Sequence, residues 1–338
     1  MQQRLAAFIA RQLGVESVTV ANLQRLPGGA SRETWSLDVS CAREGKRISM
    51  SLVLRRDLPA GPAQTSRRDE FLLLQAAYAD GVPVPKVHWL GADTETLGAP
   101  FFLMDRVEGE TLARRLLRDD QYAQARQVMT AQLGRILARI HGIDRARHDL
   151  GFLTEPPPDA TPAAGELDRY EQIFRFIAPE PHPAFELAIR WLRHHMPHRG
   201  EPHGRGRVLV HGDYRIGNVI FGPEGVRAIL DWELAHVGDP MEDLGWMCVR
   251  SWRFGSDDKP VGGIGMREEF FRAYEEGGGK VDPERVRFWE VLGNLKWAII
   301  CIMQAKSHLD GHVHSVELAS LGRRTAEMEL ELLDLIDG

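Results

Sequence analysis

The spacing of hydrophobic residues along the chain changes near residue 105. Before that point, short runs of apolar and polar residues are separated by turns containing glycine or proline, which is typical of strands. Strands are expected over residues 18–26, 33–40, 48–56, 86–93 and 99–107, with helices over 1–15 and 66–81. Ser66 is the expected N-cap of the second helix, and Gly81 follows its end. The pattern therefore predicts a small β-sheet with one main helix.

Beyond Gly109 the hydrophobic spacing is that of amphipathic helices. Leu133, Ile136, Leu137 and Ile140 would share one face of a helix over 124–143. Further helices are expected over residues 110–120, 183–196, 282–306 and 315–336, with a long irregular connector over 154–167. Apolar runs at 208–210, 219–221 and 226–230 predict short strands inside this region. The whole pattern predicts an α+β fold with two domains, residues 1–104 and 105–338.

Two stretches near these last strands carry polar residues at regular places, LVHGDYRIGNVIF (209–221) and VRAILDWELAHVGDPMEDLGW (226–246). Asn218 follows Asp213 by five residues, and Asp231 comes directly after the third apolar run. Mg²⁺ prefers oxygen ligands and usually takes one or two carboxylates, with phosphates and waters as the rest. Asn218 and Asp231 are therefore candidate Mg²⁺ ligands for phosphoryl transfer, and Asp213 is the candidate acceptor of the substrate hydroxyl proton.

Other polar residues of the first stretch are expected to support Asp213. His211 is interpreted as a buried histidine that orients the loop, because the role of general base falls to Asp213 in this pattern. Arg215 lies two residues after Asp213 and is a further candidate residue of the catalytic group.

The second stretch carries residues with expected structural roles. Asp239 precedes Pro240 and is the expected N-cap of the next helix, from which Asp243 would brace the loop. Trp232 is expected to pack in the core, whereas the pattern assigns no role to Glu233.

The order and spacing of Asp213, Asn218 and Asp231 match the catalytic-loop and metal-binding motifs of kinases. The chain resembles the protein-kinase-like small-molecule phosphotransferases, in particular the aminoglycoside phosphotransferase and choline kinase families. The two stretches are most similar to the branch whose kinase domain accompanies acyl-CoA dehydrogenases. The resemblance runs from LPGGASRETW (26–35) to the final helices. It implies a two-lobed protein-kinase-like fold, with a small antiparallel β-sheet N-lobe that binds nucleotide and a larger, mostly helical C-lobe that carries catalysis.

This resemblance also implies the reaction and its cofactors. The expected activity is transfer of the γ-phosphate of ATP or GTP, with Mg²⁺, to a hydroxyl group of a small molecule. The tip of the first expected hairpin would cover the phosphates through backbone N–H groups, although a plain hairpin turn would look the same. The residues of that tip are Gly28, Gly29, Ala30 and Ser31.

In kinases a strand lysine holds the nucleotide phosphates and pairs with a helix glutamate. Here Arg55 stands in the place of the lysine, and Glu70 is the matching glutamate. Arginine keeps the positive charge but presents a wider, planar group. The connection between the lobes would contact the nucleotide base, and its residues are Met104, Asp105, Arg106 and Val107.

Composition argues against several other classes of protein. The net charge of −6 and the pI near 6.1 are unlike those of a general nucleic-acid binder. No apolar run approaches the roughly 20 residues that span a bilayer, and the first residues lack the pattern of a signal peptide. Cys41, Cys248 and Cys301 lie far apart and are expected to be free thiols. We therefore expect a cytoplasmic monomer or homodimer with no nucleic-acid or membrane partner.

Three alternatives to the kinase hypothesis are left open. The segment GDYRIGN (212–218) is superficially similar to a two-metal phosphoesterase, but such a site needs further carboxylate and histidine ligands. A metal-free structural loop is the second alternative, because carboxylates also cap helices. A nucleotide-binding pseudokinase or regulatory switch is the third, because Arg55 replaces the lysine of the kinase ion pair.

The acceptor is suggested by charge, and the resemblance to the acyl-CoA dehydrogenase-associated branch implies a similar hydroxyacyl substrate. Aminoglycosides are polycations, and clefts lined by one sign of charge concentrate ligands of the opposite sign. Residues 190–207 are instead rich in histidine and arginine, and Arg215 lies close to Asp213 in sequence. This favours a neutral or anionic acceptor, such as a hydroxy acid or a hydroxyacyl thioester, unless the basic run is only a solvated loop.

Overall fold

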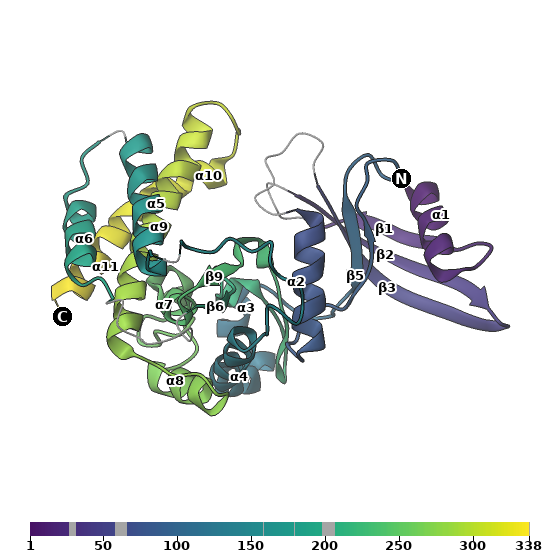
Figure 1. The fold of residues 1–338 in the computed structure, drawn as a ribbon, viewed down its shortest axis with the longest axis horizontal. Coiled ribbons are helices and arrows are strands. Elements are labelled where there is room, and N and C mark those ends of the chain that lie inside the picture. The colour runs from purple at the N-terminus through teal and green to yellow at the C-terminus, as the bar shows by residue number, and fades with distance from the viewer. Residues whose placement is uncertain (27–31, 58–65, 158, 179, 198–206, 338) are drawn as a thin grey trace. The chain divides into compact units, whose positions relative to one another are not determined.

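The computed structural model describes residues 1–26, 32–57, 66–157, 159–178, 180–197 and 207–337 (Figure 1). The chain folds into two compact units. The sheet unit contains Met1–Glu110, Asp144–Phe152 and Arg227–Leu234, and the helical unit contains Thr111–Ile143, Leu153–Val226 and Ala235–Gly338. The assignment of nucleotide binding to residues 1–104 and of catalysis to residues 105–338 stays a prediction.

The sheet unit is built on five antiparallel strands in the order β1-β2-β3-β5-β4. Their bounds are β1 (Thr19–Arg25), β2 (Arg32–Arg43), β3 (Lys46–Asp57), β4 (Val87–Gly91) and β5 (Phe101–Asp105). Glu44 and Gly45 form the turn between β2 and β3 with φ angles of 52° and 74°. Such left-handed pairs favour tight hairpins, because their twist matches that of the strands. The predicted order of strands and helix is confirmed.

Two helices, α1 (Gln2–Leu13) and α2 (Arg67–Ala79), complete this unit. Leu5 and Ile9 of α1 pack in one apolar cluster with Leu52 and Leu54 of β3. Side chains alternate between the two faces of a strand, so the next residue of β3, Arg55, belongs to the opposite face. The predicted cap of α2 is confirmed, because the Ser66 hydroxyl accepts a hydrogen bond from a backbone N–H of the first turn.

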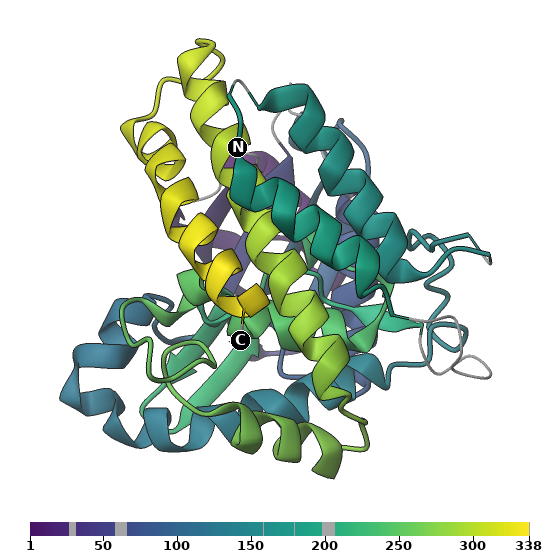
Figure 2. The same cartoon turned by 90° about the vertical axis from the view of Figure 1, so that its left-hand side faces the viewer.

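The helical unit holds most of the remaining helices. They are α3 (Ala113–Arg118), α4 (Ala123–His141), α5 (Pro162–Ile177), α6 (Pro183–His194), α7 (Pro240–Cys248), α8 (Arg267–Glu276), α9 (Pro283–Leu309), α10 (Val316–Leu321) and α11 (Thr325–Asp337). The face of α4 predicted from its apolar spacing is buried. Helix α9 contacts α5, α6, α7, α10 and α11, and Figure 2 shows the yellow α11 lying along the yellow-green α9. More than half of the side chains of α9 are buried, which explains why its apolar residues are not confined to one face.

Short strands interrupt the helices as predicted. They are β6 (Val208–Val210), β7 (Val219–Gly222) and β8 (Gly225–Ile229), to which the structure adds β9 (His236–Gly238). Strand β6 pairs antiparallel with β9, and β7 pairs with β8.

One predicted connector is wrong in its second half. Residues 154–167 are not irregular throughout, because α5 begins at Pro162. The Thr161 hydroxyl caps the helix by accepting the N–H of Ala164 at 3.2 Å. Proline suits the first turn of a helix, where its missing N–H would have no partner in any case. The proline-rich composition indicated a loop, although a helix begins within it at Pro162.

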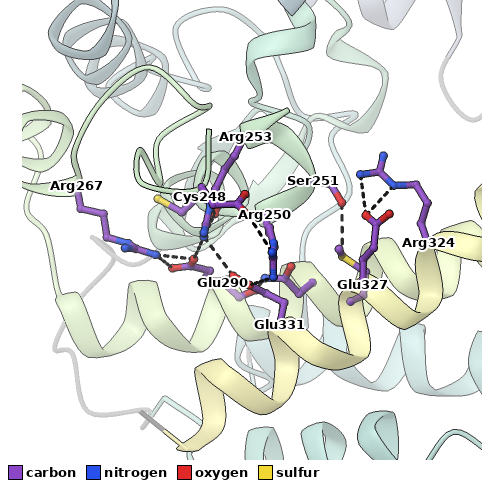
Figure 3. Close-up of polar contacts among 12 residues, drawn as sticks. Cys248, Arg250, Ser251, Arg253, Arg267, Glu290, Arg324, Glu327 and Glu331 are labelled. Carbon is purple, nitrogen blue, oxygen red and sulfur yellow. Dashed lines mark hydrogen bonds and ion pairs between the residues drawn. The ribbon is translucent and has the colours of Figure 1, made fainter. Parts of the chain in front are cut away.

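A buried ionic network joins the 3₁₀ helix η4 (Arg250–Arg253) to α8, α9 and α11 (Figure 3). Arg253 Nη2 donates to Glu290 Oε1 of α9 at 3.1 Å and to Glu331 Oε1 of α11 at 3.2 Å. Arg267 of α8 also donates to Glu290, at 2.6 Å. Arg250 Nη1 lies 3.3 Å from the other carboxylate oxygen of Glu331, Oε2. The C-terminal helix is thus fixed by ion pairs as well as by apolar packing.

Within the described residues, every helix is too short or too polar to cross a membrane. Cys41, Cys248 and Cys301 are buried free thiols.

Candidate active site

The loop that carries the first polar stretch joins β6 to β7 in the helical unit. Leu209 and Val210 before it and Val219 and Phe221 after it are buried. The core therefore holds both ends of a polar loop, an arrangement that suits functional side chains.

Asp243 of α7 holds the start of this loop through its backbone. Its Oδ2 accepts the N–H of His211 at 2.7 Å, and its Oδ1 accepts the N–H of Gly212 at 2.9 Å. Nε2 of His141, on α4, lies 3.1 Å from the same Oδ2, within hydrogen-bond distance. Burial acts to raise the pKa of Asp243, but hydrogen bonds and electrostatic interactions with His141 and His211 lower it below its usual value. The prediction that Asp243 braces the loop is confirmed.

Two more predictions for this region hold. Asp239 caps α7 by accepting the N–H of Met241 at 3.0 Å, and its second oxygen lies 2.6 Å from Arg285 Nη2. His211 is fully buried, and its Nδ1 lies 3.3 Å from the backbone nitrogen of Asp213. A buried ring in this position can orient the loop, as predicted for His211.

The carboxylate of Asp213 is held by three side-chain donors. Arg215 Nε donates to Oδ1 at 2.9 Å, and the indole N–H of Trp246 donates to the same oxygen at 2.8 Å. Asn218 Nδ2 donates to Oδ2 at 2.6 Å. Hydrogen bonds from several donors fix the direction of a carboxylate. The predicted base is thus an oriented carboxylate, brought together with Arg215 and Asn218.

Asn218 is also placed by its side-chain nitrogen, which donates to the backbone oxygen of Asp213 at 3.0 Å. Because this nitrogen is engaged by Asp213, the amide oxygen is the atom of Asn218 left for a ligand. That oxygen makes no hydrogen bond with the part of the chain that the structure describes. An amide oxygen of this kind is a suitable ligand for Mg²⁺.

The sheet unit brings Arg55 and Glu70 together. Arg55 of β3 donates through Nη1 to Glu70 Oε1, so the predicted ion pair is present. Glu70 is fully buried, and Arg67 donates to its other carboxylate oxygen. Arg55 Nη2 also lies 3.6 Å from Asp231 Oδ1. Burial acts to lower the pKa of Arg55, but the carboxylates of Glu70 and Asp231 raise it above its usual value.

The neighbouring Arg56 serves a different purpose on the opposite face of β3. Its Nη2 donates to Glu33 Oε2 at 2.6 Å, and its Nη1 donates to the carbonyl of Leu97 at 2.9 Å. A shift of one residue moves a side chain to the other face of a sheet. The structure therefore supports the register in which Arg55, and not Arg56, stands in the place of the kinase lysine.

Asp231 follows β8 with an unusual backbone. Its φ angle is 65°, in the left-handed region that few residues other than glycine adopt. Its side chain is 35% exposed, so the carboxylate can reach a ligand. The next residue, Trp232, is fully buried, which confirms its predicted packing role. The charge of Glu233 acts on Arg55, a contribution that the sequence did not suggest.

Four residues are predicted to contact the nucleotide base, namely Met104, Asp105, Arg106 and Val107. The structure places them at the end of β5 and directly after it. The N–H groups of Asp105 and Arg106 already donate to the carbonyls of Lys86 and Ser51, both at 2.9 Å. The side chain of Arg106 turns toward β2 and lies 3.1 Å from Asp38. These N–H groups are thus engaged within the sheet unit.

The predicted phosphate-covering tip lies outside the described residues. It comprises Gly28, Gly29, Ala30 and Ser31.

Sequence reasoning missed several side chains around Asp213. Trp246 stands on α7, and Lys296 of α9 places its ammonium 4.8 Å from the centre of the Trp246 ring. The guanidinium of Arg215 lies 4.8 Å from the ring centre of Trp252. A lysine within the apolar run NLKWAII (294–300) was a signal for Lys296, because lysine is rarely buried without a partner.

The fold is of the kind expected for a kinase-like phosphotransferase. The family described as "Phosphotransferase enzyme family" matches residues 22–289. The chain therefore belongs to this family.

Solved structures and curated relatives agree with this assignment. A structure from Ralstonia eutropha named as an aminoglycoside phosphotransferase is 24% identical, with a TM-score of 0.78, over 100% of this chain and 98% of its own. A mutant of the aminoglycoside phosphotransferase APH(4)-Ia, in complex with AMP-PNP and hygromycin B, is 15% identical, with a TM-score of 0.59, over 98% of this chain and 97% of its own. These likenesses confirm the predicted α+β kinase-like fold.

Acyl-CoA dehydrogenase family member 10 of Mus musculus is 28% identical over 341 residues. The match covers 97% of this chain but 30% of the relative, so the chain spans under a third of that protein's length. The predicted similarity to proteins named as acyl-CoA dehydrogenase family members is confirmed.

Proposed function

We propose that this chain transfers the γ-phosphoryl group of ATP or GTP to a hydroxyl group of a small molecule, with Asp213 as the general base. The observation that carries the proposal is the carboxylate of Asp213. It accepts hydrogen bonds from Arg215, Trp246 and Asn218 in a loop whose backbone is fixed by Asp243. A carboxylate oriented in this way can accept a proton from a hydroxyl group in hydrogen-bond reach.

The reaction forms one bond and breaks another at the γ-phosphorus. The acceptor oxygen attacks this atom in line, and the bond from the phosphorus to the oxygen that bridges the β- and γ-phosphates breaks. The nucleoside diphosphate leaves with the bonding electron pair. The proton of the acceptor hydroxyl passes to the carboxylate of Asp213, whose direction is fixed by its three donors.

Arg55 and Glu70 are proposed to hold the nucleotide phosphates. Arg55 keeps its positive charge, and Glu70 fixes its direction from a fully buried position. Arginine binds phosphate in a planar, two-point geometry, which differs from the point charge of the kinase lysine. Phosphate binding alone would also suit a nucleotide-binding pseudokinase, so the argument for an active enzyme rests on the presence of Asp213, Asn218 and Asp231.

Asn218 and Asp231 are the proposed Mg²⁺ ligands. An amide oxygen and a carboxylate oxygen are each of the kind that Mg²⁺ takes from proteins, with phosphates and water as the rest of its shell. Among the described residues, histidine, cysteine, aspartate and glutamate form no group of three that could hold a metal, which argues against a two-metal phosphoesterase. When bound, the ion would neutralise charge on the transferred phosphoryl group.

The proposed acceptor is a hydroxy acid or its acyl thioester, not an aminoglycoside. Two positive side chains lie around Asp213. Arg215 donates a hydrogen bond to its carboxylate, and Lys296 contacts the ring of Trp246, which is itself a donor to Asp213. Positive charge near the base favours a neutral or anionic acceptor. The resemblance to an acyl-CoA dehydrogenase family member supports a hydroxyacyl group.

The test is a screen of hydroxylated compounds for release of ADP or GDP, followed by detection of the phosphorylated product. We expect turnover on hydroxy acids or hydroxyacyl thioesters and little on kanamycin-type compounds. Thermal stabilisation by Mg²⁺ and nucleotide without turnover on any acceptor would favour the regulatory switch. Efficient phosphorylation of aminoglycosides alone would contradict the proposed acceptor.

A further inference from the structure

A lysine side chain fills a small aromatic and acidic box in the helical unit. Lys296 is 6% exposed, and its ammonium lies 4.8 Å from the centre of the Trp246 ring and 5.4 Å from that of Tyr170. Glu242 Oε1 lies 3.5 Å from the same ammonium. The three walls come from α5 and α7, while the lysine comes from α9. This box is defined by Tyr170, Glu242 and Trp246.

Aromatic faces combined with a carboxylate are the groups by which proteins recognise ammonium ligands. The box therefore has the chemistry of a site for a cation. It also lies next to the proposed reaction, because its Trp246 wall donates to Asp213 Oδ1 at 2.8 Å. A ligand in this box would be separated from the proposed base by one indole ring.

The lysine remains charged in this place. Burial acts to lower the pKa of Lys296, but Tyr170 and the nearby carboxylates, with Glu242 first among them, raise it above its usual value. A second cation that approached the box would meet this charge, and like charges brought together oppose binding.

We propose that Lys296 is a specificity-determining residue, a resident cation that occupies an ammonium site beside Asp213 and thereby excludes positively charged acceptors. This inference rests on the proposed function, because it concerns the acceptor of the same reaction. It predicts that the lysine can be replaced by a ligand of matching charge. It also predicts that removal of its charge admits amino alcohols.

The first experiment removes the side chain of Lys296 beyond Cβ and supplies the missing part as a separate molecule, n-propylammonium. In Lys296→Ala, we expect n-propylammonium to raise the melting temperature, whereas neutral n-propanol and sodium chloride at the same concentrations do not. The wild type should not respond to n-propylammonium. The matched control is Lys306→Ala, because Lys306 lies on the same helix, is 43% exposed and pairs with Asp310.

The second experiment compares acceptors. The ratio of kcat/KM for an amino alcohol to that for a hydroxy acid should rise at least about tenfold in Lys296→Ala and Lys296→Met, which corresponds to about 1.4 kcal/mol of discrimination. Lys306→Ala should leave the ratio unchanged. Lys296→Met fills the box with an uncharged chain of similar length. It can therefore be used to measure the ratio if the alanine variant folds poorly.

The outcomes separate this inference from the proposed function. If the wild type phosphorylates no hydroxylated compound, the proposed function fails, yet propylammonium binding still tests the box. The inference is overturned if a folded Lys296→Ala ignores propylammonium or if a folded variant keeps the wild-type ratio. It is also overturned if both variants fail to fold and propylammonium does not restore folding, since Lys296 would then act only in stability.

Discussion

Among single residues, Asp213 carries the most direct prediction. Asp213→Asn should lower kcat by roughly 10²–10⁴, the range for a lost general base, while nucleotide binding stays intact. An amide cannot take the proton of the acceptor, although it fills the same space. Steady-state release of nucleoside diphosphate and thermal shift with nucleotide measure the two effects. Asp257→Asn, at a half-exposed partner of Arg250, is the control, and an unchanged kcat for Asp213→Asn would remove this residue from the mechanism.

Arg55 and Arg56 form a natural pair for a second test. Arg55→Ala should raise the KM for nucleotide more than the KM for acceptor, because only Arg55 points to Glu70 and Asp231. Arg55→Lys should recover part of the loss, since lysine keeps the positive charge but not the planar, two-point geometry. Arg56→Ala should reduce stability without this change, because its partners are Glu33 and a backbone carbonyl. Equal effects of the two alanine variants on the nucleotide KM would contradict the assignment.

The sequence predicted Asp213 and Asn218 through their spacing within one short segment, and Asp243 through its place in the helix that follows Asp239. It could not predict Trp246 or Lys296, although both belong to the surroundings of Asp213. Trp246 lies on a different element from Asp213, and Lys296 lies on a helix whose apolar run indicates only burial. Contacts between elements depend on how helices pack, and spacing along the chain does not contain that information.

At the scale of elements, the link between α7 and the loop should depend on pH. The pKa of Asp243 is lowered in the folded protein. A carboxylate of this kind contributes stability above its unfolded pKa of about 3.9, and this stability is lost as pH falls through the lower folded value. The free energy of unfolding should therefore fall below about pH 4, and Asp243→Asn should flatten this acid limb. Urea unfolding between pH 3 and 7 measures it, and an identical acid limb in the variant would contradict the role.

The C-terminal helix α11 offers two glutamates for a matched comparison (Figure 3). Glu331→Ala should cost about 1–3 kcal/mol of unfolding free energy, because it leaves buried Arg253 with one fewer partner. Glu327→Ala removes only an exposed pair with Arg324 and should cost less than about 1 kcal/mol. Chemical denaturation of both variants measures the difference. Equal costs would show that the buried network adds nothing to the attachment of α11.

Element prediction succeeded where hydrophobic spacing was regular and failed where local chemistry competed with it. The buried face of α4 was evident from its apolar residues. The start of α5 was missed, although Thr161 and Pro162 form a helix-start signal, because the surrounding prolines indicated a loop. Strand β9 is only three residues long and forms by pairing with β6. The local sequence does not indicate this contact, because the two strands are distant in the chain.

For the whole molecule, the division into units separates residues that are neighbours in sequence. Arg227–Leu234, which contains Asp231, folds with the sheet unit, while Asp213 and Asn218 belong to the helical unit. The family resemblance gave the overall architecture, since its motifs extend over nearly the whole chain. Hydrophobic spacing alone gives a change of character near residue 105, but it cannot show that a later segment returns to the first unit.

The left-handed backbone of Asp231 has a consequence for how this position can vary. In a library of all amino acids at residue 231, each variant would have to meet two independent requirements. Its backbone must adopt the left-handed conformation, and its side chain must supply the metal ligand. Glycine and asparagine tolerate a φ of 65° and should leave folding intact, whereas valine and isoleucine should lower the yield of folded protein. Only residues with a carboxylate should keep Mg²⁺-dependent activity. Sorting the library first for folded protein and then for turnover should place glycine among the folded but inactive variants, and an active glycine variant would show that the carboxylate is dispensable.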